Sequence, residues 1–153
     1  MNLLNLLASG PTTFHGEGIN HEQEKFTGAL NVQPLEGGIA VLLSYTATLK
    51  TGAVVHSEST LLGVGADGKL CLWPVMSELP VVLPHTEVTS KTEPGRYTLA
   101  VFASGPRDDD TAFREEITIQ INEEGSIVYS HAWGLPGGQF AERSSCTMKP
   151  NSA

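Results

Sequence analysis

Alternation of apolar and polar residues with a period close to two constrains the fold of this chain more than any other sequence feature. Ile39, Val41, Leu43, Tyr45 and Ala47 form one apolar set, and the residues between them are on average more polar. Similar alternation recurs in later and earlier segments, at residues 26–32, 96–103, 113–122 and 127–133. Successive side chains of a β-strand point to opposite faces, so a period of two predicts strands.

Turn signals separate these segments at intervals of roughly 10 to 15 residues, which is typical of hairpin-connected strands. Asp67-Gly68, between two strand-like segments, is a strong hairpin signal. Residues 76–86 differ, because Pro80 and Pro84 cannot donate hydrogen bonds to a neighbouring strand. We therefore expect residues 76–86 to form an edge or irregular segment.

The predicted fold class is all-β: an antiparallel up-and-down β-barrel of about 8–10 strands with a short N-terminal helix. Leu3, Leu4 and Leu7 at helical spacing place that helix in residues 1–13, and a single barrel domain follows at residues 14–150. A β-sandwich is the main alternative, but its Greek-key connections need longer crossovers than the tight turns seen here. A barrel of about this size is either just filled by side chains or able to hold one small ligand.

Composition narrows the classes of partner. The 9 Lys and Arg against 17 Asp and Glu give a formal net charge of −8, which argues against nucleic-acid and anionic-membrane partners. No apolar segment is long enough to span a membrane, and the N-terminus lacks the basic region of a secretory signal. We predict a cytoplasmic protein in which Cys71 and Cys146 are free thiols.

The chain resembles the calycin superfamily, which contains the lipocalins and fatty-acid-binding proteins. The resemblance depends on Phe14-His15-Gly16-Glu17-Gly18 ahead of the first clear strand, on the hairpin turns, and on the final strand at residues 143–148. In layout it is most similar to nitrobindin-like and uncharacterised bacterial barrels. The resemblance implies a barrel with an internal ligand, which is haem in nitrobindin-like barrels and a carboxylic acid in fatty-acid-binding ones.

Three departures from these relatives bear on the ligand. Nitrobindin-like barrels typically carry Trp where this chain has Phe14, and they ligate haem through a His near the C-terminal end. The last His here is His131, in the penultimate predicted strand. Fatty-acid-binding relatives have a helical lid, for which this sequence shows no pattern. Their carboxylate-binding Arg lies on the last strands, where Arg143 is suitably located.

Two histidine-containing strands supply candidate ligand-binding residues. His56 and Glu58 share one face of the third predicted strand, and inside a barrel they would have to bond to each other or lie in a wet cavity. The alternative places both on the outer face. His131 shares a face with Tyr129 and Trp133, which indicates burial, either as a ligand-binding group or as a hydrogen-bonded core histidine.

The other candidates are an arginine and two tyrosines. Arg143 could anchor a ligand carboxylate through paired hydrogen bonds, and an external ion pair with Glu142 or a cross-strand acid is the alternative. Tyr45 and Tyr97 lie on apolar faces, where they could line a pocket or pack in the core. His85 follows Pro84 and is expected in a loop without a special role.

The favoured function is binding of a small apolar molecule with a polar or acidic group in the barrel interior. The candidate ligand-binding residues are Tyr45, His56, Glu58, Tyr97, His131 and Arg143. No catalytic residue, metal site or specific cofactor is predicted, because nucleophile, phosphate-loop and His-x-His patterns are absent from the sequence. One alternative is a haem-binding or metal-dependent enzyme of the nitrobindin type. Another is a structural or interaction module, for which residues 76–86 could form a homodimer contact.

Overall fold

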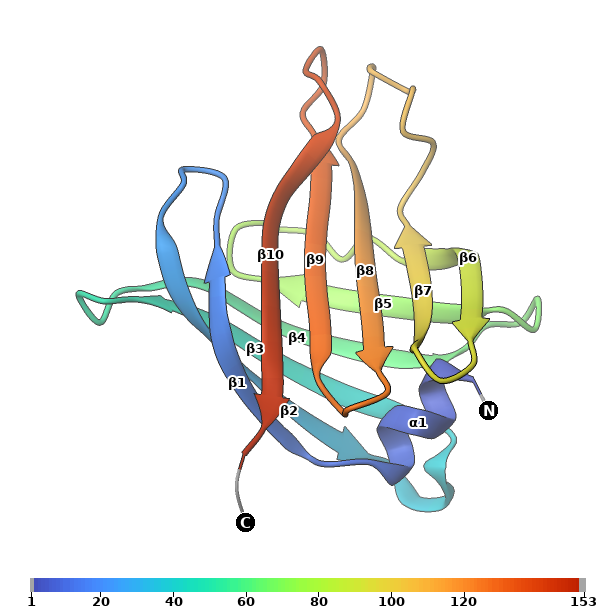
Figure 1. The fold of residues 1–153 in the computed structure, drawn as a ribbon. Coiled ribbons are helices and arrows are strands. Elements are labelled where there is room, and N and C mark those ends of the chain that lie inside the picture. The colour runs from blue at the N-terminus through green and yellow to red at the C-terminus, as the bar shows by residue number, and fades with distance from the viewer. Residues whose placement is uncertain (1, 152–153) are drawn as a thin grey trace.

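Ten antiparallel strands close into one barrel in the computed structural model, which describes residues 2–151. The elements are α1 (Leu3–Ser9), β1 (Thr13–Ile19), β2 (Lys25–Pro34), a short 3-10 helix η1 (Glu36–Gly38), β3 (Val41–Leu49), β4 (Val54–Val64), β5 (Leu70–Met76), β6 (His85–Glu93), β7 (Tyr97–Ala103), β8 (Arg114–Asn122), β9 (Ile127–Gly134) and β10 (Ala141–Pro150). Each strand pairs with its neighbours in the sequence, and β1 pairs with β10 (Figure 1). The predicted up-and-down barrel is confirmed, and the sandwich alternative is wrong.

The alternation read from the sequence corresponds to the inner and outer faces of the strands. Along β2, Phe26, Gly28, Leu30 and Val32 are buried and the residues between them are exposed. In β7 the buried inner face is not the set of alternate residues that the sequence suggested, which contained Tyr97, Leu99, Val101 and Ala103. The inner face carries Thr98, Ala100 and Phe102, whereas Tyr97 lies on the half-buried face.

Gly16 and Gly18 of β1 allow the barrel to close. β1 runs alongside β10 in Figure 1, and Gly16 lies opposite Met148 in the strand register. A Cβ atom at Gly16 would collide with the carbonyl oxygen of Thr147, and one at Gly18 would collide with the ring of Phe26. The motif at residues 14–18 therefore has a structural explanation, because only glycine permits this close approach of two backbones.

The connection between β5 and β6 is the irregular part of the barrel. The two strands share only the pairs Cys71–Thr86 and Leu72–His85, and residues 77–84 form no strand, as the two prolines predict. His85 is not in a loop, which corrects the expectation for this residue. It begins β6 and is fully buried, with Nε2 3.0 Å from Glu115 Oε1 and Nδ1 donating to the Leu83 carbonyl at 2.6 Å.

One half of the barrel interior is filled by side chains. Its apolar core includes Leu30, Val32, Val41, Leu43, Leu62, Leu72, Phe102, Ile117, Ile119, Ile127 and Met148. The predicted N-terminal helix is present as α1, whose Leu3, Leu4 and Leu7 are buried against this core. The side chain of Asn2 accepts a hydrogen bond from the Asn5 amide and caps the helix. α1 lies at one end of the barrel (Figure 1), where its leucines pack against this core.

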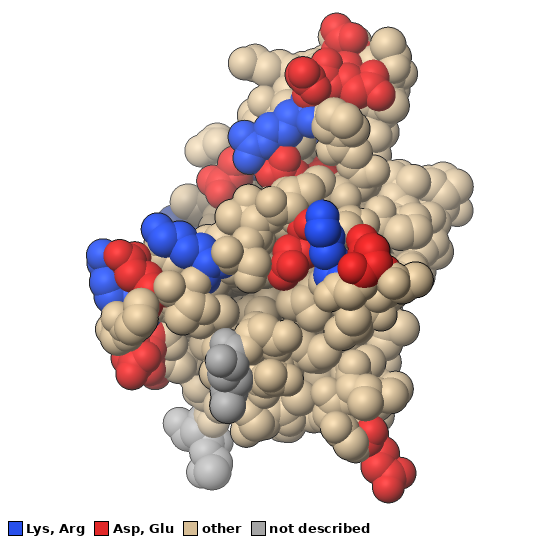
Figure 2. Space-filling model, turned by 90° about the vertical axis from the view of Figure 1, so that its right-hand side faces the viewer, with Lys and Arg blue, Asp and Glu red and all other residues tan. Residues whose placement is uncertain are grey.

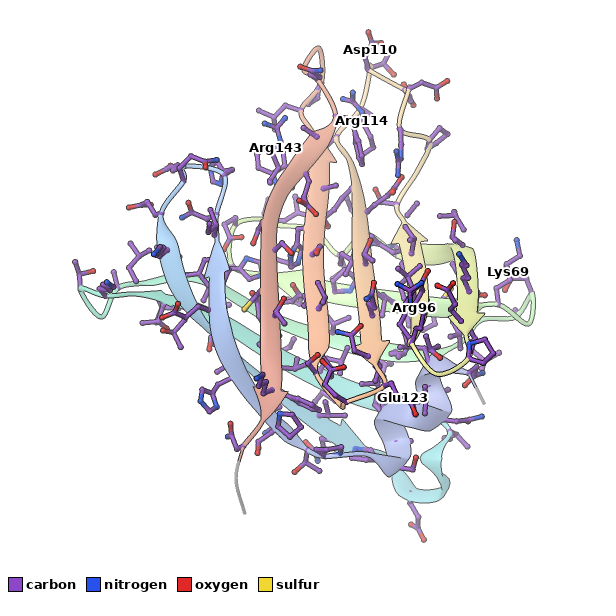
Figure 3. The ribbon with its side chains drawn as sticks, viewed as in Figure 1. Lys69, Arg96, Asp110, Arg114, Glu123 and Arg143 are labelled. Atoms are coloured by element: carbon purple, nitrogen blue, oxygen red, sulfur yellow. The ribbon has the colours of Figure 1, made fainter. Side chains whose placement is uncertain are left out.

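Charged side chains are dispersed over the outer surface. On the side shown in Figure 2, each group of Lys or Arg lies beside Asp or Glu, with uncharged surface between the groups. Figure 3 shows Arg114 and Arg143 at the end of the barrel opposite α1, and Arg96 and Glu123 at the α1 end. No helix among residues 2–151 is long and apolar enough to span a membrane.

Candidate functional site

The barrel end opposite α1 opens into a cavity of about 580 Å³. The strands that end there are joined by the β1–β2, β7–β8 and β9–β10 loops (Figure 1). Aromatic and aliphatic side chains supply much of its wall, among them Phe26, Tyr45, Met76, Phe113 and Trp133. The interior of the barrel is therefore partly filled and partly open, which leaves room for a ligand.

A buried carboxylate, that of Glu58 on β4, lies at the inner end of this cavity and is the centre of a polar cluster. Oε1 of Glu58 is 3.0 Å from Nε2 of His56 and 2.9 Å from Nε2 of His131. Oε2 accepts hydrogen bonds of 2.5 Å from the hydroxyl groups of Thr60 and Tyr129. Four donors therefore satisfy one buried carboxylate, and the alternative that placed His56 and Glu58 on the outer face is wrong.

The pKa of Glu58 is lowered below its ordinary range. Burial opposes its ionisation, but the hydrogen bonds from His131 and His56, together with their charges, outweigh burial. The pKa of Tyr129 is raised, first by burial and then by the negative charge of Glu58. Glu58 is therefore an acceptor of hydrogen bonds, and the Tyr129 hydroxyl remains a donor.

His56 lies between two carboxylates. Its Nδ1 is 2.6 Å from Oε2 of Glu78, in the segment after β5, and its Nε2 faces Glu58. Burial disfavours the positive charge, but the hydrogen bonds and charges of Glu58 and Glu78 raise the pKa of His56 to about 9. At neutral pH both ring nitrogens donate, and the ring is an imidazolium.

His131 has a different hydrogen-bonding state. Its Nε2 donates to Glu58, and Nδ1 has no hydrogen-bond partner among residues 2–151. Among residues 2–151, the Tyr45 hydroxyl is the single fully buried side-chain polar atom without a hydrogen-bond partner. Nδ1 of His131 also lacks a partner but is not fully buried, so it remains accessible from the cavity that the imidazole ring lines. His131 also stacks on Tyr45, with ring centroids 6.1 Å apart.

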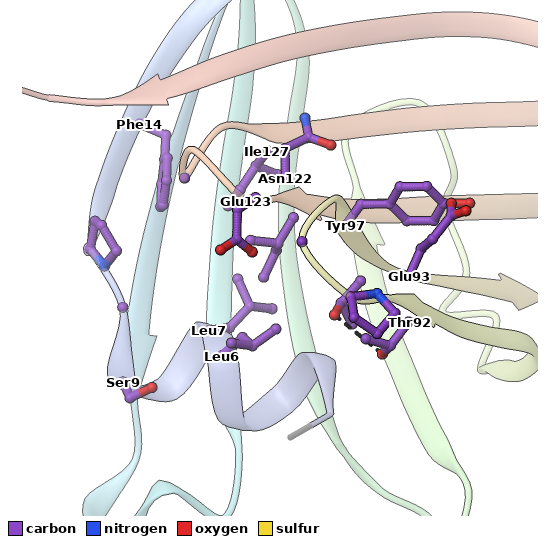
Figure 4. Close-up of a pocket in the computed structure, with 17 residues that line it drawn as sticks. Leu6, Leu7, Ser9, Phe14, Thr92, Glu93, Tyr97, Asn122, Glu123 and Ile127 are labelled. Carbon is purple, nitrogen blue, oxygen red and sulfur yellow. Dashed lines mark hydrogen bonds between the residues drawn. The ribbon is translucent and has the colours of Figure 1, made fainter.

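The structure brings together five of the six predicted site residues. Tyr45, His56, His131 and Arg143 line the cavity, and Glu58 bonds to two of them from beneath. Tyr97 is separate. It lines a second, smaller cavity of about 340 Å³ between α1, the β6–β7 turn and the β8–β9 turn, together with Leu6, Leu7 and Ile127 (Figure 4).

Arg143 forms part of the cavity wall, where it stacks on an indole ring. Its guanidinium carbon lies 4.6 Å from the centroid of the Trp133 ring, Nε donates to the Trp133 carbonyl, and Nη2 donates to the Gln139 carbonyl. The alternative of an external ion pair is not found for Arg143 within residues 2–151. Nη1 has no partner among these residues, so both of its N–H groups are left for a ligand.

Two features of the site were not predicted from the sequence. Glu78 completes the surroundings of His56, but no pattern in the irregular segment after β5 marks it as a site residue. Arg114 is buried and donates to the carbonyl groups of Arg107, Leu135 and Gly138. It thereby joins the β7–β8 and β9–β10 loops, which border the cavity.

The nitrobindin resemblance implies haem, but His56, Glu58 and His131 are not arranged to serve together as ligands of a haem iron. A porphyrin leaves iron only two axial positions, on opposite faces of the ring. His56, Glu58 and His131 instead place three ligand atoms within 4.8 Å of one another, and Nε2 of His131 is engaged with Glu58. The final strand β10 contains no histidine. The three side chains cannot all ligate one haem iron.

Comparison with known proteins identifies the fold. No protein-family model and no curated protein sequence matches the chain. The crystal structure of Rv2717c from M. tuberculosis is similar, with a TM-score of 0.77 and 12% sequence identity over 97% of each chain. At this level of identity the likeness shows the fold alone: this chain is a ten-stranded antiparallel barrel with an N-terminal helix.

Proposed function

We propose that the protein binds one small, mainly apolar molecule carrying a polar group in the open half of the barrel. The observation that carries the proposal is the cavity of about 580 Å³, which has aromatic walls and a polar cluster at its inner end. Ligand pockets of soluble proteins have volumes of about 300–1,000 Å³ and combine apolar walls with polar groups that orient the ligand.

The charges around the cavity favour an uncharged polar group over an acidic one. Glu22, Glu24, Glu78 and Glu115 line the cavity, and Arg143 is the single Lys or Arg among the described lining residues. Carboxylates near a partly dehydrated pocket repel an anion more strongly than they would in water. An alcohol is therefore expected to bind more tightly than a carboxylic acid with the same alkyl chain.

Displacement of a neutral fluorescent dye tests both statements. N-phenyl-1-naphthylamine is expected to bind with a stoichiometry of about one, and decanol should displace it at lower concentration than decanoate. Ala47 is buried, lines the cavity and lies on the inner face of β3, so Ala47→Phe should reduce dye binding by filling the cavity. Ala29 is exposed on the neighbouring strand β2, so Ala29→Phe is the matched control. Equal dye binding by both variants would contradict the proposal.

The homodimer contact expected at residues 76–86 stays a prediction. Val81 and Val82 in this segment are exposed, at 54% and 49%. Light scattering of the purified chain, compared with a Val81→Lys variant, tests whether this segment forms a contact between copies.

A further inference from the structure

We propose that His56, Glu58 and His131 form a binding site for one divalent transition-metal ion, with Zn²⁺ as the reference ion. The site lies at the inner end of the cavity, where the three side chains meet. This inference goes beyond binding of an apolar molecule and does not depend on it.

The spacing of the three donor atoms suits a single small ion. Oε1 of Glu58 lies 3.0 Å from Nε2 of His56 and 2.9 Å from Nε2 of His131, and all three atoms lie within 4.8 Å of one another. Around a tetrahedral ion with metal–ligand bonds of about 2.0–2.1 Å, ligand atoms are roughly 3.3 Å apart. Small movements of the rings would therefore place an ion between the three atoms.

The second oxygen of Glu58 is held by other groups, which orients the carboxylate. Tyr129 and Thr60 both donate to Oε2, from β9 and β4 respectively. Oε1 therefore faces the two imidazole rings and no other described donor. This is the arrangement needed for a carboxylate that binds an ion through one oxygen.

Glu78 supplies the outer partner that a metal-binding histidine usually has. A histidine that binds metal through one ring nitrogen commonly donates its other N–H to a carboxylate, which fixes the ring. Nδ1 of His56 lies 2.6 Å from Oε2 of Glu78, so Nε2 is the nitrogen left for the ion. Glu58 and Glu78 together also carry the two negative charges that balance a divalent cation.

Coordination through Nε2 displaces any proton on that nitrogen, so binding of the ion replaces the hydrogen bonds to Glu58. Nδ1 of His56 keeps its contact with Glu78, and Nδ1 of His131, which has no partner among residues 2–151, can carry the ring proton while Nε2 binds the ion.

The residue types select among ions. Two imidazole groups and one carboxylate are typical ligands of catalytic zinc, which keeps a further position open. Calcium and magnesium prefer oxygen ligands alone, so they should bind poorly here. Because His56 and His131 line the cavity, the open position would face a bound water molecule or the polar group of a ligand.

Titration of the metal-free chain with Co²⁺ and Zn²⁺ tests the site. After treatment with EDTA and dialysis, Co²⁺ should produce the intense visible absorption of tetrahedral coordination, and Zn²⁺ should abolish it at about one equivalent. Calorimetry should show one Zn²⁺ per chain and no Mg²⁺ binding. Absence of the Co²⁺ bands together with absence of Zn²⁺ binding would overturn the proposal.

Variants separate the site from adventitious binding. His56→Gln and His131→Gln should each weaken Zn²⁺ binding at least about 100-fold, and Glu78→Gln about 10- to 100-fold, as expected for an outer partner. His15→Gln is the control, because His15 is exposed on β1 and is not part of the cluster. An equal loss in His15→Gln, or no loss in the other three, would contradict the site.

Foldedness is checked by circular dichroism for every variant. Glu78 is half-exposed, so Glu78→Gln remains informative even where a change at a buried ligand prevents folding. Dye binding, measured on the same EDTA-treated samples, reports separately on the cavity. A protein that binds the dye but no metal refutes the metal site alone, and one that binds metal but no dye refutes the ligand proposal alone.

Discussion

Glu58 on β4 accepts a hydrogen bond of 2.5 Å from the hydroxyl group of Tyr129 on β9. The two strands are not neighbours in the barrel, since β5, β6, β7 and β8 separate them on one side. This bond therefore joins opposite walls across the interior. Together with the bonds from His56 and His131, it connects the inner end of the cavity to the filled half of the barrel.

Replacing Glu58 should destabilise the protein strongly. Glu58→Ala leaves the donors of Tyr129, Thr60 and two histidines without their acceptor inside the barrel. Breaking a buried charged network of this kind lowers the free energy of unfolding by about 3–5 kcal/mol. Urea denaturation followed by Trp fluorescence measures the change. Glu78→Ala is the matched control, because Glu78 is half-exposed and its ion pair should contribute less than about 1 kcal/mol. Equal losses in the two variants would contradict the argument.

The pair of His85 and Glu115 should stabilise the irregular β5–β6 connection. Both side chains are buried, and only two residue pairs join β5 to β6. His85→Leu leaves the Glu115 carboxylate without its partner, and we expect a loss of about 3 kcal/mol. Hydrogen exchange should show the largest increase in β6. His21→Leu is the control, since the pair of His21 with Glu22 is exposed and its loss should be within about 0.5 kcal/mol. A uniform increase in exchange would argue against a local role.

Arg143 should affect acidic ligands more than neutral ones. Its Nη1 is the unpaired donor of a guanidinium that lines the cavity, whereas Nε and Nη2 donate to backbone carbonyls. Arg143→Ala should therefore weaken decanoate binding by a larger factor than decanol binding, measured by displacement of the neutral dye. Arg96→Ala, at the opposite end of the barrel, is the control (Figure 3). An equal effect on both ligands would show that Arg143 contributes to the cavity wall but does not bind the carboxylate of the ligand.

The sequence predicted strand faces well but could not predict which strands face each other. Alternation in residues 127–133 placed Tyr129 and His131 together on one buried face, and it placed His56 with Glu58 on one face without deciding between the inside and the outside of the barrel. That these two faces meet depends on the tilt and stagger of ten strands, which no local pattern encodes. Glu58 and Tyr129 are 71 residues apart. The cluster therefore emerges only from the closed barrel.

The remaining differences have similar physical causes. Glu78 reaches His56 because the irregular segment after β5 folds back, with an isolated bridge between Met76 and Leu79. His85 is buried because β6 begins immediately after Pro84, so that its side chain meets Glu115 on β8. Both contacts depend on the path of a loop, whereas periodicity reports only on regular strands.

Cys146 should be an unreactive thiol in the folded protein. It is buried on β10 next to Tyr45, and burial raises its pKa above the ordinary value of 9.0. Because the thiolate is the reactive form, a Cys71→Ser variant should react with Ellman's reagent at pH 8 much more slowly when folded than when unfolded. Rapid labelling of the folded variant would contradict the burial of Cys146.

The same pKa shift has a consequence for stability above pH 9. The folded state holds the thiol proton more tightly than the unfolded chain, so the thiol lowers the free energy of unfolding as the pH rises above 9.0. Cys71→Ser should therefore lose more stability between pH 8 and pH 10 than the double variant Cys71→Ser, Cys146→Ala. Identical losses would mean that the Cys146 thiol has the same pKa in both states.

Haem should not be ligated by His131. Nε2 of His131 donates to Glu58, and the stacked ring of Tyr45 covers one face of the imidazole. A haem iron bound to Nε2 would have to displace the contact with Glu58 and leave that carboxylate buried beside the porphyrin, which desolvation disfavours. Any shift of the Soret band on addition of haem should therefore be the same in the wild type and in the His131→Ala variant. Nonspecific association would give the same spectrum in both proteins. A shift present in the wild type and absent in the variant would instead establish His131 as an axial ligand and require the cluster to rearrange.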